Sequence, residues 1–402
     1  EGVKRLRETP EKIQEWGMDA RTFSLLMRLS EAIQGFPRHL GIHTGGFLIA
    51  KRPITECVPV EKASMIHRYV IQWNKDDINV LKMLKIDVLG LGMLTALQKC
   101  FVLLRQHKNI ELDLYNVPAE DAATYAMIQK ADTVGTFQIE SRAQMSLLPR
   151  LRPKTFYDLV IEVAIVRPGP IQGGMIHPFI RRRHGQEAIT FAHKDLIPIL
   201  GKTCGVPIFQ EQIMQIASTV GGFTPGEADE LRRIMSSSWK KHDLMAGLRQ
   251  RLISGMISHG IELAYAEQIY QTIVGFASYG FPESHAASFA LITYTSCYIK
   301  CHHPEIFVAS LLNAQPMGFY SPRALIADAQ RHGVKFRGVD VQRSEYDYLI
   351  EEGEVRAGFR AVYGFREKHV QSLVKARREG GPFHDLADFV RRSGLNKSGL
   401  MQ

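Results

Sequence analysis

The residues best suited to chemistry are a lysine and an aspartate in the stretch Lys85–Gly92, which has the sequence KIDVLGLG. The pattern predicts a strand over 84–89 that is bounded by glycines. Side chains two residues apart on a strand point to the same face, so Lys85 and Asp87 are expected to project together. The carboxylate can then hold Mg²⁺ while the ammonium group faces a phosphate. Taken alone, such a pair is more often a salt-bridged surface feature.

Short elements are predicted to position this pair. Apolar strands are expected over 47–50 and 69–73, and a helix is expected over 9–34. A further helix follows the lysine-containing strand, and we expect residues 43–105 to form one α/β unit. The predicted buried stripe of this helix consists of Met93, Leu97, Cys100, Phe101 and Leu104.

The remainder of the chain is predicted to be mostly helical over 118–312. After that point the pattern predicts a strand over 334–341. A β-hairpin is then expected around Glu351-Glu-Gly353, and the last forty residues return to helix. The fold class is therefore predicted to be α+β and mostly helical.

Composition narrows the choice of partners. The 402 residues include 50 Lys and Arg against 41 Asp and Glu, which gives a net charge of +9. This excess suits a polyanion such as nucleic acid, although many basic proteins bind none. There is no run of about eighteen apolar residues, so no membrane span is expected. Five scattered cysteines favour a reducing cytoplasm.

Several motifs resemble those of bacterial C-family DNA polymerases, the DNA polymerase III alpha subunit family. The segment Gln72–Asp77 followed by Lys85–Thr95 resembles the last palm segment of these enzymes. Further matches in the family's order and spacing are Gly135–Arg142, Arg167–Pro170, Gln210–Gln212, Glu227–Arg233 and Glu283–Ser288. Several motifs in register are much more specific than any one of them.

Within this family the sequence most resembles the error-prone translesion branch, of ImuC type. The deciding segments are Gly35–Leu40, Val70–Trp73, Leu147–Pro153, Phe156–Val166, Phe281–His285, Lys300–Pro304 and Asn313–Tyr320. The high-fidelity replicative branch is less similar at these places.

The resemblance implies a domain organisation. Residues 1–42 would be the end of a helical thumb, and 43–93 the last part of a nucleotidyltransferase-like palm. Residues 94–312 would form large helical fingers. Residues 313–402 would form a clamp-proximal region with a β-hairpin and a helix-hairpin-helix unit.

The resemblance also implies a reaction, which is template-directed DNA synthesis across lesions from dNTPs at a primer 3′ hydroxyl. Asp87 would be the third carboxylate that holds two Mg²⁺ ions, and Lys85 would lie beside it. The family takes its other two carboxylates from an Asp-x-Asp pair upstream in the palm. No such pair precedes His43, and both chain ends resemble cuts. We therefore expect this chain alone to be inactive, whereas the full-length protein would be active.

Other residues are predicted to bind substrates. Arg232 and Arg233 match the family's triphosphate-binding arginines, since guanidinium groups are well suited to phosphate. Arg167 and His285 are expected near the incoming nucleotide, although a structural role is equally plausible for each. The candidate DNA-binding residues are Arg181, Arg182, Arg183, Lys240, Lys241, Gly364 and Arg366. Arg366 replaces the second glycine of the usual helix-hairpin-helix turn, so it would supply charge instead of a backbone amide.

The partners implied by the error-prone branch are primer-template DNA, the sliding clamp, and two mutasome subunits. One of these is a Y-family-like protein and the other is a RecA-like accessory protein, all in a bacterial cytoplasm. Two alternatives stay open. The first is a replicative alpha subunit, and the second is a non-catalytic DNA-binding module.

Overall fold

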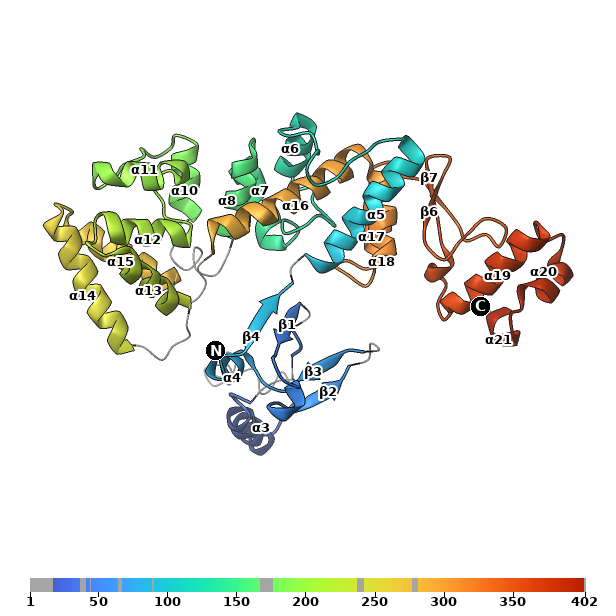
Figure 1. Cartoon of the computed structure of the whole chain (residues 1–402), viewed down its shortest axis with the longest axis horizontal. Helices are drawn as coiled ribbons and strands as arrows, with labels where there is room; N and C mark the ends of the chain where they lie inside the picture. Colours follow the sequence, from blue (N-terminus) through green and yellow to red (C-terminus); the bar gives the residue numbers. More distant parts are fainter. Residues whose placement is uncertain are drawn as a thin grey trace. The chain divides into compact units, whose positions relative to one another are not determined.

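The computed structural model of the chain describes residues 17–36, 41–43, 45–63, 67–88, 90–166, 176–236, 242–276 and 281–400 (Figure 1). The chain divides into two packed units, residues 1–89 and residues 90–402. Helices predominate and the strands form small sheets, which confirms the predicted mostly helical α+β class. None of the helices in these ranges combines the length and the apolar composition that crossing a membrane would need.

The first unit is built from two antiparallel strand pairs and short helices. Its elements are α3 (Ala20–Ala32), β1 (Gly46–Ile49), the 3₁₀ turn η1 (Ile54–Glu56), β2 (Val60–Lys62), β3 (Tyr69–Ile71), α4 (Lys75–Val80) and β4 (Leu84–Asp87). Strand β1 pairs with β4, and β2 pairs with β3. The strands predicted over 47–50, 69–73 and 84–89 are therefore confirmed, with ends that differ by at most two residues.

Helix α3 begins later than the helix predicted over 9–34. The carboxylate of Asp19 accepts hydrogen bonds from the backbone N–H groups of Arg21 (2.9 Å) and Thr22 (2.8 Å). This is N-cap geometry, in which a side chain satisfies amides that have no partner inside the helix. The prediction of helix immediately before Ala20 is therefore wrong, because the chain is extended at the capping residue.

The second unit is helical up to the end of α18. The helices and 3₁₀ turns up to the end of α18 are α5 (Leu91–Lys108), α6 (Ala122–Gln129), α7 (Arg142–Leu151), α8 (Phe156–Ile165), α10 (Ile176–Arg183), η2 (Lys194–Leu196), α11 (Ile197–Leu200), η3 (Gly201–Thr203), α12 (Gln210–Thr219), α13 (Pro225–Ser236), α14 (His242–Ser258), α15 (Leu263–Phe276), α16 (Glu283–His302), α17 (Pro304–Asn313) and α18 (Pro322–Arg331). The long helix α16 packs against α8, α6 and α17, so segments that are far apart in the sequence share one core.

The stripe predicted on α5 is confirmed at its most apolar positions. Met93, Leu97, Cys100 and Leu104 are each 5% exposed or less, and Phe101 is half-buried. These side chains pack against α17 and its neighbours. The prediction that 43–105 form one unit is therefore wrong, since α5 buries its apolar face in the second unit.

A three-stranded sheet follows α18. Its strands are β5 (Phe336–Arg337), β6 (Leu349–Glu351) and β7 (Glu354–Arg356), in the order β5-β7-β6. Glu352 and Gly353 connect β6 to β7 with φ angles of 53° and 79°, as a two-residue turn of this twist requires. The predicted hairpin is confirmed, whereas the strand predicted over 334–341 shortens to two residues.

The last helices form a separate small core. They are α19 (Glu367–Gly380), α20 (Leu386–Ser393) and α21 (Lys397–Leu400), preceded by the 3₁₀ turn η4 (Phe359–Ala361). The core consists of Phe359, Val370, Leu373, Val374, Phe383 and Leu395. Arg377 ties these helices to the sheet region, because it pairs with Glu345 (2.7 Å) and donates to the carbonyl oxygens of Val341 and Ser344.

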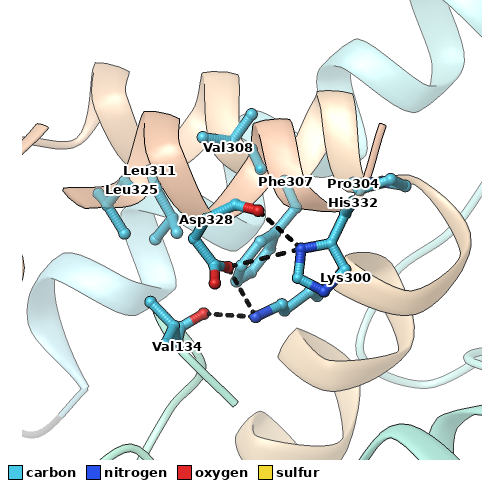
Figure 2. Close-up of a pocket in the computed structure, with 10 residues that line it drawn as sticks. Val134, Lys300, Pro304, Phe307, Val308, Leu311, Leu325, Asp328 and His332 are labelled. Atoms are coloured by element: carbon cyan, nitrogen blue, oxygen red, sulfur yellow. Dashed lines mark hydrogen bonds and ion pairs between the residues drawn. The ribbon is translucent and has the colours of Figure 1, made fainter. Parts of the chain in front are cut away.

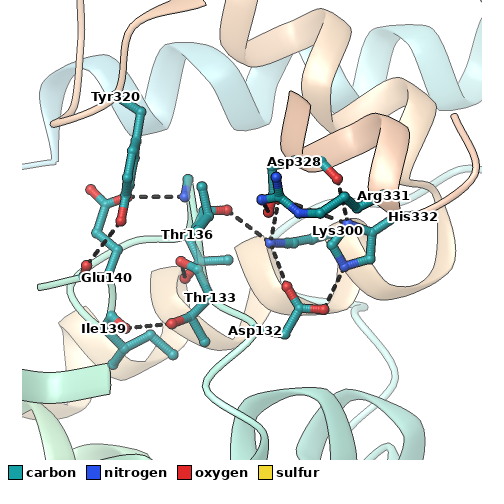
Figure 3. Close-up of polar contacts among 12 residues, drawn as sticks. Asp132, Thr133, Thr136, Ile139, Glu140, Lys300, Tyr320, Asp328, Arg331 and His332 are labelled. Carbon is teal, nitrogen blue, oxygen red and sulfur yellow. Dashed lines mark hydrogen bonds and ion pairs between the residues drawn. The ribbon is translucent and has the colours of Figure 1, made fainter. Parts of the chain in front are cut away.

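A buried ion-pair network joins α16 to α18 and to the loop after α6 (Figure 3). The ammonium group of Lys300, whose side chain is 4% exposed, donates to the carbonyl oxygen of Val134 (3.0 Å) and pairs with Asp328 (3.0 Å) and Asp132 (3.1 Å). His332 contacts the Asp132 carboxylate through Nε2 and donates from Nδ1 to the Asp328 carbonyl oxygen (2.8 Å). Each of the three ammonium protons therefore has an acceptor.

These contacts also shift the pKa values of Asp132 and His332. Burial alone would raise the pKa of Asp132, but the hydrogen bond from His332 and the charge of Lys300 outweigh burial and lower that pKa. Burial alone would lower the pKa of His332, yet its hydrogen bonds to Asp132 and to the Asp328 carbonyl raise it. The charged forms of both groups are thus favoured.

The cavity beside the network has a volume of about 20 Å³. Lys300, Asp328 and His332 line it together with apolar side chains such as Phe307 and Leu311 (Figure 2). This space holds about one water molecule and is too small for a nucleotide. The network therefore has a structural role, which is to hold α16 and α18 together.

A buried carboxyl group on α8 has no such hydrogen bonds among the described residues. Glu162 is fully buried, and neither of its carboxyl oxygens has a hydrogen-bond partner in the described part of the chain. Burial raises the pKa of Glu162 to about 8, so the neutral acid predominates at pH 7.

Candidate active site

The hairpin formed by β1 and β4 positions the lysine and the aspartate. In this antiparallel pair Gly46 lies opposite Asp87, and Leu48 lies opposite Lys85. Alternation along β4 places Lys85 and Asp87 on one face, while Leu84 and Ile86 point to the other. The prediction that the two polar side chains project together is confirmed by their direct contact.

That contact is a close ion pair. Nζ of Lys85 lies 2.6 Å from Oδ1 and 2.8 Å from Oδ2 of Asp87. The side chains are 24% and 42% exposed, so water reaches both groups. The carboxylate is therefore accessible to a ligand, and the ammonium group already lies where it can meet an anion bound at the same place.

A histidine that we did not predict as a site residue lies beside the pair. Nε2 of His43 is 3.8 Å from Oδ1 of Asp87, and its Nδ1 accepts a hydrogen bond from the backbone N–H of Gly45 (3.2 Å). The contact with Asp87 does not follow from local sequence, because the pairing of β1 with β4 brings the two segments together across about forty residues. The only local signal is the glycine pair that follows the histidine.

Gly46 is required by this close approach. A Cβ atom at this position would lie 2.9 Å from Nδ1 of His43 and 3.3 Å from Cε of Lys85. Any larger residue would displace the imidazole ring or the lysine side chain. The glycine therefore makes room for the two side chains that flank the carboxylate.

The opposite face of this hairpin is apolar and open to water. Phe47, Ile49, Leu84 and Ile86 are between 42% and 63% exposed. The polar and apolar faces are thus separated by strand alternation alone.

Asp87 offers a suitable oxygen ligand for a hard divalent cation, but one carboxylate does not complete a site. The groups of three or more potential ligands in the described ranges all lie in the second unit. They are Asp121 with Cys301 and His302, His193 with Asp195 and His259, and Asp132 with Asp328 and His332. Asp87 therefore fits one ligand position of a metal centre, and no group of three potential ligands among the described residues includes it.

Comparisons with known proteins match the chain in three segments. Residues 2–90 match the model of the bacterial DNA polymerase III alpha NTPase domain, and residues 93–260 match that of the finger domain of the same subunit. Residues 333–402 match a helix-hairpin-helix motif. The break between the first two matches coincides with the boundary between the two packed units.

Curated relatives cover the whole chain. The error-prone DNA polymerase of Bdellovibrio bacteriovorus is 56% identical over 407 residues, which include 100% of this chain and 38% of the relative. That of Pseudomonas fluorescens is 52% identical over 97% of this chain and 39% of its own length. Error-prone DNA polymerase 2 of Agrobacterium fabrum is 51% identical over 96% of the chain and 36% of its own length.

This chain belongs to the bacterial DNA polymerase III alpha subunit family. It spans less than two fifths of the length of these relatives. Within the family match, Lys85 and Asp87 fall in the alpha NTPase segment, close to its end. Their ion pair thus lies in the segment that precedes the match to the finger domain.

The arginines predicted to bind the triphosphate fall in the finger segment. Arg232 and Arg233 lie in α13, a helix that Thr224 and Glu227 cap reciprocally through hydrogen bonds of 2.8 Å and 3.4 Å. The side chains of the two arginines are outside the described residues. Arg167, Lys240 and Lys241 also lie outside them. Their roles stay predictions.

His285 lies in the first turn of α16 in the finger region. Its ring is 4.8 Å from that of Phe281 and 4.2 Å from that of Phe289, measured between centroids. The same turn is held by Tyr157, whose hydroxyl donates to Glu283 (2.7 Å). This aromatic packing fixes the position of the imidazole. The predicted role near the nucleotide is untested.

All three arginines on α10 have partners within the fold. The Nε of Arg182 donates to Glu187 (2.8 Å), and Arg183 pairs with Asp158 and donates to the Leu151 carbonyl oxygen (3.0 Å). Arg181 also contacts Glu187 but is 55% exposed, against 19% and 21% for the other two. DNA binding by this cluster stays a prediction, for which Arg181 is the most accessible member.

The helix-hairpin-helix segment presents its predicted residues to solvent. Gly364 has a φ angle of 76° and is exposed, and Arg366 is exposed at the N-cap position of α19, without a side-chain capping hydrogen bond. The backbone therefore makes the tight turn that this motif needs before its second helix. Contact of this turn with DNA stays a prediction.

Proposed function

We propose that this chain is part of an error-prone DNA polymerase that carries out template-directed DNA synthesis across lesions in damage-induced mutagenesis. The observation that carries the proposal is identity of 51% to 56% over nearly the whole chain with proteins named error-prone DNA polymerase. The accessible carboxylate on β4, within the alpha NTPase match, supports it further.

In this proposal Asp87 is a ligand of a divalent cation, and the cofactor is a pair of Mg²⁺ ions whose other ligands lie outside this chain. Such ions activate the attacking hydroxyl and stabilise the developing phosphoryl charge when bound. Lys85 keeps the carboxylate in place before the cation arrives and then offers its ammonium group to a phosphate oxygen. His43 limits the space on the other side of the carboxylate.

The remaining roles follow the family. Arg232, Arg233, His285 and Arg167 would bind the incoming dNTP. The DNA-binding set would be Arg181, Arg182, Arg183, Lys240, Lys241, Gly364 and Arg366. The helix-hairpin-helix match and the net charge of +9 support contact with DNA.

We further propose the domain division at 42, 93 and 312 into thumb, palm, fingers and clamp-proximal region. The proposed partners are primer-template DNA, the sliding clamp, and the Y-family-like and RecA-like mutasome subunits, in a bacterial cytoplasm. The finger match beginning at residue 93 supports one of these boundaries.

Primer extension by the full-length protein tests the central assignment. Asp87→Asn should lower the rate of dNTP incorporation at least about a thousandfold, because a metal ligand is lost from the transition state. Glu56→Gln, which removes an exposed carboxylate from the same unit, should leave the rate within about twofold of wild type. Full activity of Asp87→Asn would show that the metal site has been misplaced.

Two further measurements separate the alternatives. The present chain alone should incorporate no dNTP, and robust incorporation would contradict the need for outside ligands. On a template with an abasic site, the full-length protein should extend past the lesion, whereas a replicative alpha subunit should stall. A DNA-binding module without catalysis would show salt-sensitive binding and no extension by the full-length protein.

A further inference from the structure

The strongest unassigned feature is a basic hollow between the end of α7 and the helix α10. Its volume is about 540 Å³, which is within the usual range for ligand sites. The polar lining consists of Arg150, Arg152, His177, Arg181, His184 and Gln186. Five of these six side chains are arginine or histidine, and no carboxylate lines the hollow.

The two arginines at the end of α7, Arg150 in its last turn and Arg152 just after it, form no ion pair with a described carboxylate. Arg150 donates from Nη2 to Nδ1 of His177 (3.3 Å), and Arg152 donates from Nε to the carbonyl oxygen of Pro149 (3.3 Å). Neither forms an ion pair with a carboxylate in the part of the chain that the structure describes. The hollow therefore holds two guanidinium charges without local counter-charge, unlike Arg182 and Arg183 on the neighbouring helix.

The histidines orient further donors. Guanidinium can only donate, so Nδ1 of His177 accepts and the ring proton is on Nε2. A carbonyl oxygen can only accept, so Nε2 of His184 donates to the carbonyl of Arg150, 2.6 Å away. The side chains of the hollow thus present mostly N–H groups, which match phosphate oxygens.

The walls of the hollow are held rigidly. Leu148 and Leu151 of α7 and Phe179 of α10 are fully buried in one core. Arg183 links the two helices by donating to the Leu151 carbonyl oxygen. A site with fixed walls loses little conformational entropy when it binds a ligand.

We propose that this hollow is a phosphate-binding site that takes the backbone of a nucleic-acid strand. Its volume exceeds what one phosphate group requires, and no Phe, Tyr or Trp side chain that could stack on a base lines it. Sequence-independent contact with successive phosphates suits such a surface. The proposal rests in part on the proposed function, which already includes Arg181 among the DNA-binding residues, and it adds Arg150 and Arg152 to them. Its test is separate from the test of synthesis, since it requires neither a metal nor a dNTP.

Fluorescence anisotropy of the whole chain with a labelled twenty-nucleotide oligothymidylate tests this site, without metal or nucleotide. Arg150→Gln/Arg152→Gln should weaken binding about tenfold at low salt. The slope of log K against log salt should fall by about 1.4, or about 0.7 for each lost phosphate contact. The matched control is Arg105→Gln/Lys130→Gln, which removes the same charge from exposed positions on α5 and after α6. It should change affinity less than about twofold.

Equal losses in the two double variants would overturn the site, because charge alone would then explain the effect. The bound phosphate could belong to a nucleic-acid backbone or to a free phosphate compound. Calorimetric titration with pyrophosphate distinguishes these two sources. Loss of pyrophosphate binding with unchanged oligothymidylate binding would overturn the nucleic-acid assignment. Should the double variant misfold, Arg152→Gln replaces it, since its described hydrogen bond is only to Pro149; that variant should lower the salt slope by about 0.7.

Discussion

Two lysine–aspartate ion pairs occupy opposite environments in this protein. Lys85 and Asp87 form a partly exposed pair on a two-stranded hairpin, with side chains 24% and 42% exposed, and His43 lies beside the carboxylate. Lys300 and Asp328 form a pair with side chains 4% and 10% exposed, and Asp132 and His332 complete its network. The residue types are the same, whereas the solvent, the number of partners and the surrounding packing differ.

The difference indicates which pair is available for chemistry. Buried charges are costly to separate because each would be left without solvent or partner. The Lys300 pair therefore fixes helices and cannot exchange its partners readily. An exposed pair contributes little to stability, so its carboxylate can bind a cation at small cost.

The largest expected effect comes from breaking the buried pair. Lys300→Met should lower the free energy of unfolding of the second unit by about 3–5 kcal/mol, because it leaves carboxylates uncompensated in the interior. Urea denaturation followed by circular dichroism measures this change. Lys99→Met is the control, since Lys99 pairs with Asp347 at 3.0 Å and is 34% exposed. It should cost less than about 1 kcal/mol, and equal losses in the two variants would refute the contrast.

An intermediate effect is expected at Glu162, a buried acid with no lysine beside it. Glu162→Leu should stabilise the second unit by about 1–3 kcal/mol at pH 5, where the carboxyl is neutral in the fold, because it removes an unsatisfied polar group. Glu162→Gln is the control, since it keeps a buried polar group but does not titrate. It should not show this gain. Denaturation midpoints at pH 5 and pH 8 provide the measurement.

The pH dependence at Glu162 has a definite sign. The folded pKa of about 8 lies above the ordinary value of 4.5, so the folded state holds a proton that the unfolded state releases. Wild-type stability should therefore fall as pH rises from about 4.5 to 8. Both Glu162 variants should show a weaker fall. Parallel profiles for wild type and Glu162→Leu would mean that this carboxyl does not titrate in the interior.

The smallest effect is expected from the exposed pair. Lys85→Met should change the local stability of the β1–β4 hairpin by less than about 1 kcal/mol, because water replaces the lost partner. Hydrogen exchange of the amides in β1 and β4, followed by mass spectrometry, measures this stability. A loss comparable to that of Lys300→Met would show that the pair holds the hairpin together and is not primarily a chemical site.

The sequence pattern predicted those structural features that depend on residues close together in the chain. The buried stripe Met93, Leu97, Cys100 and Leu104 follows from helical spacing, and the shared face of Lys85 and Asp87 follows from strand alternation. The Glu352-Gly353 turn follows from turn chemistry. In each case the relevant partners are a few residues apart.

The features that the sequence did not predict depend on contacts between residues far apart in the chain. Lys300 finds acceptors 166 and 28 residues away, and Arg183 finds its carboxylate 25 residues away. The basic hollow depends on the packing of the end of α7 beside α10. The sequence alone therefore identified Arg150 and Arg152 only as members of a family motif. His43 likewise required the pairing of β1 with β4.

The division of the β1–β4 hairpin into a polar and an apolar face has a consequence for protein engineering. Inserting one residue within β4, just before Lys85, would exchange the faces and turn the ammonium and carboxylate groups toward the apolar side. The same insertion at the exposed turn of Lys51 and Arg52, between β1 and η1, would leave the register in which Gly46 lies opposite Asp87 unchanged. Length changes introduced by design should therefore be tolerated at that turn, whereas inside the strand they should abolish the proposed metal-binding role of Asp87.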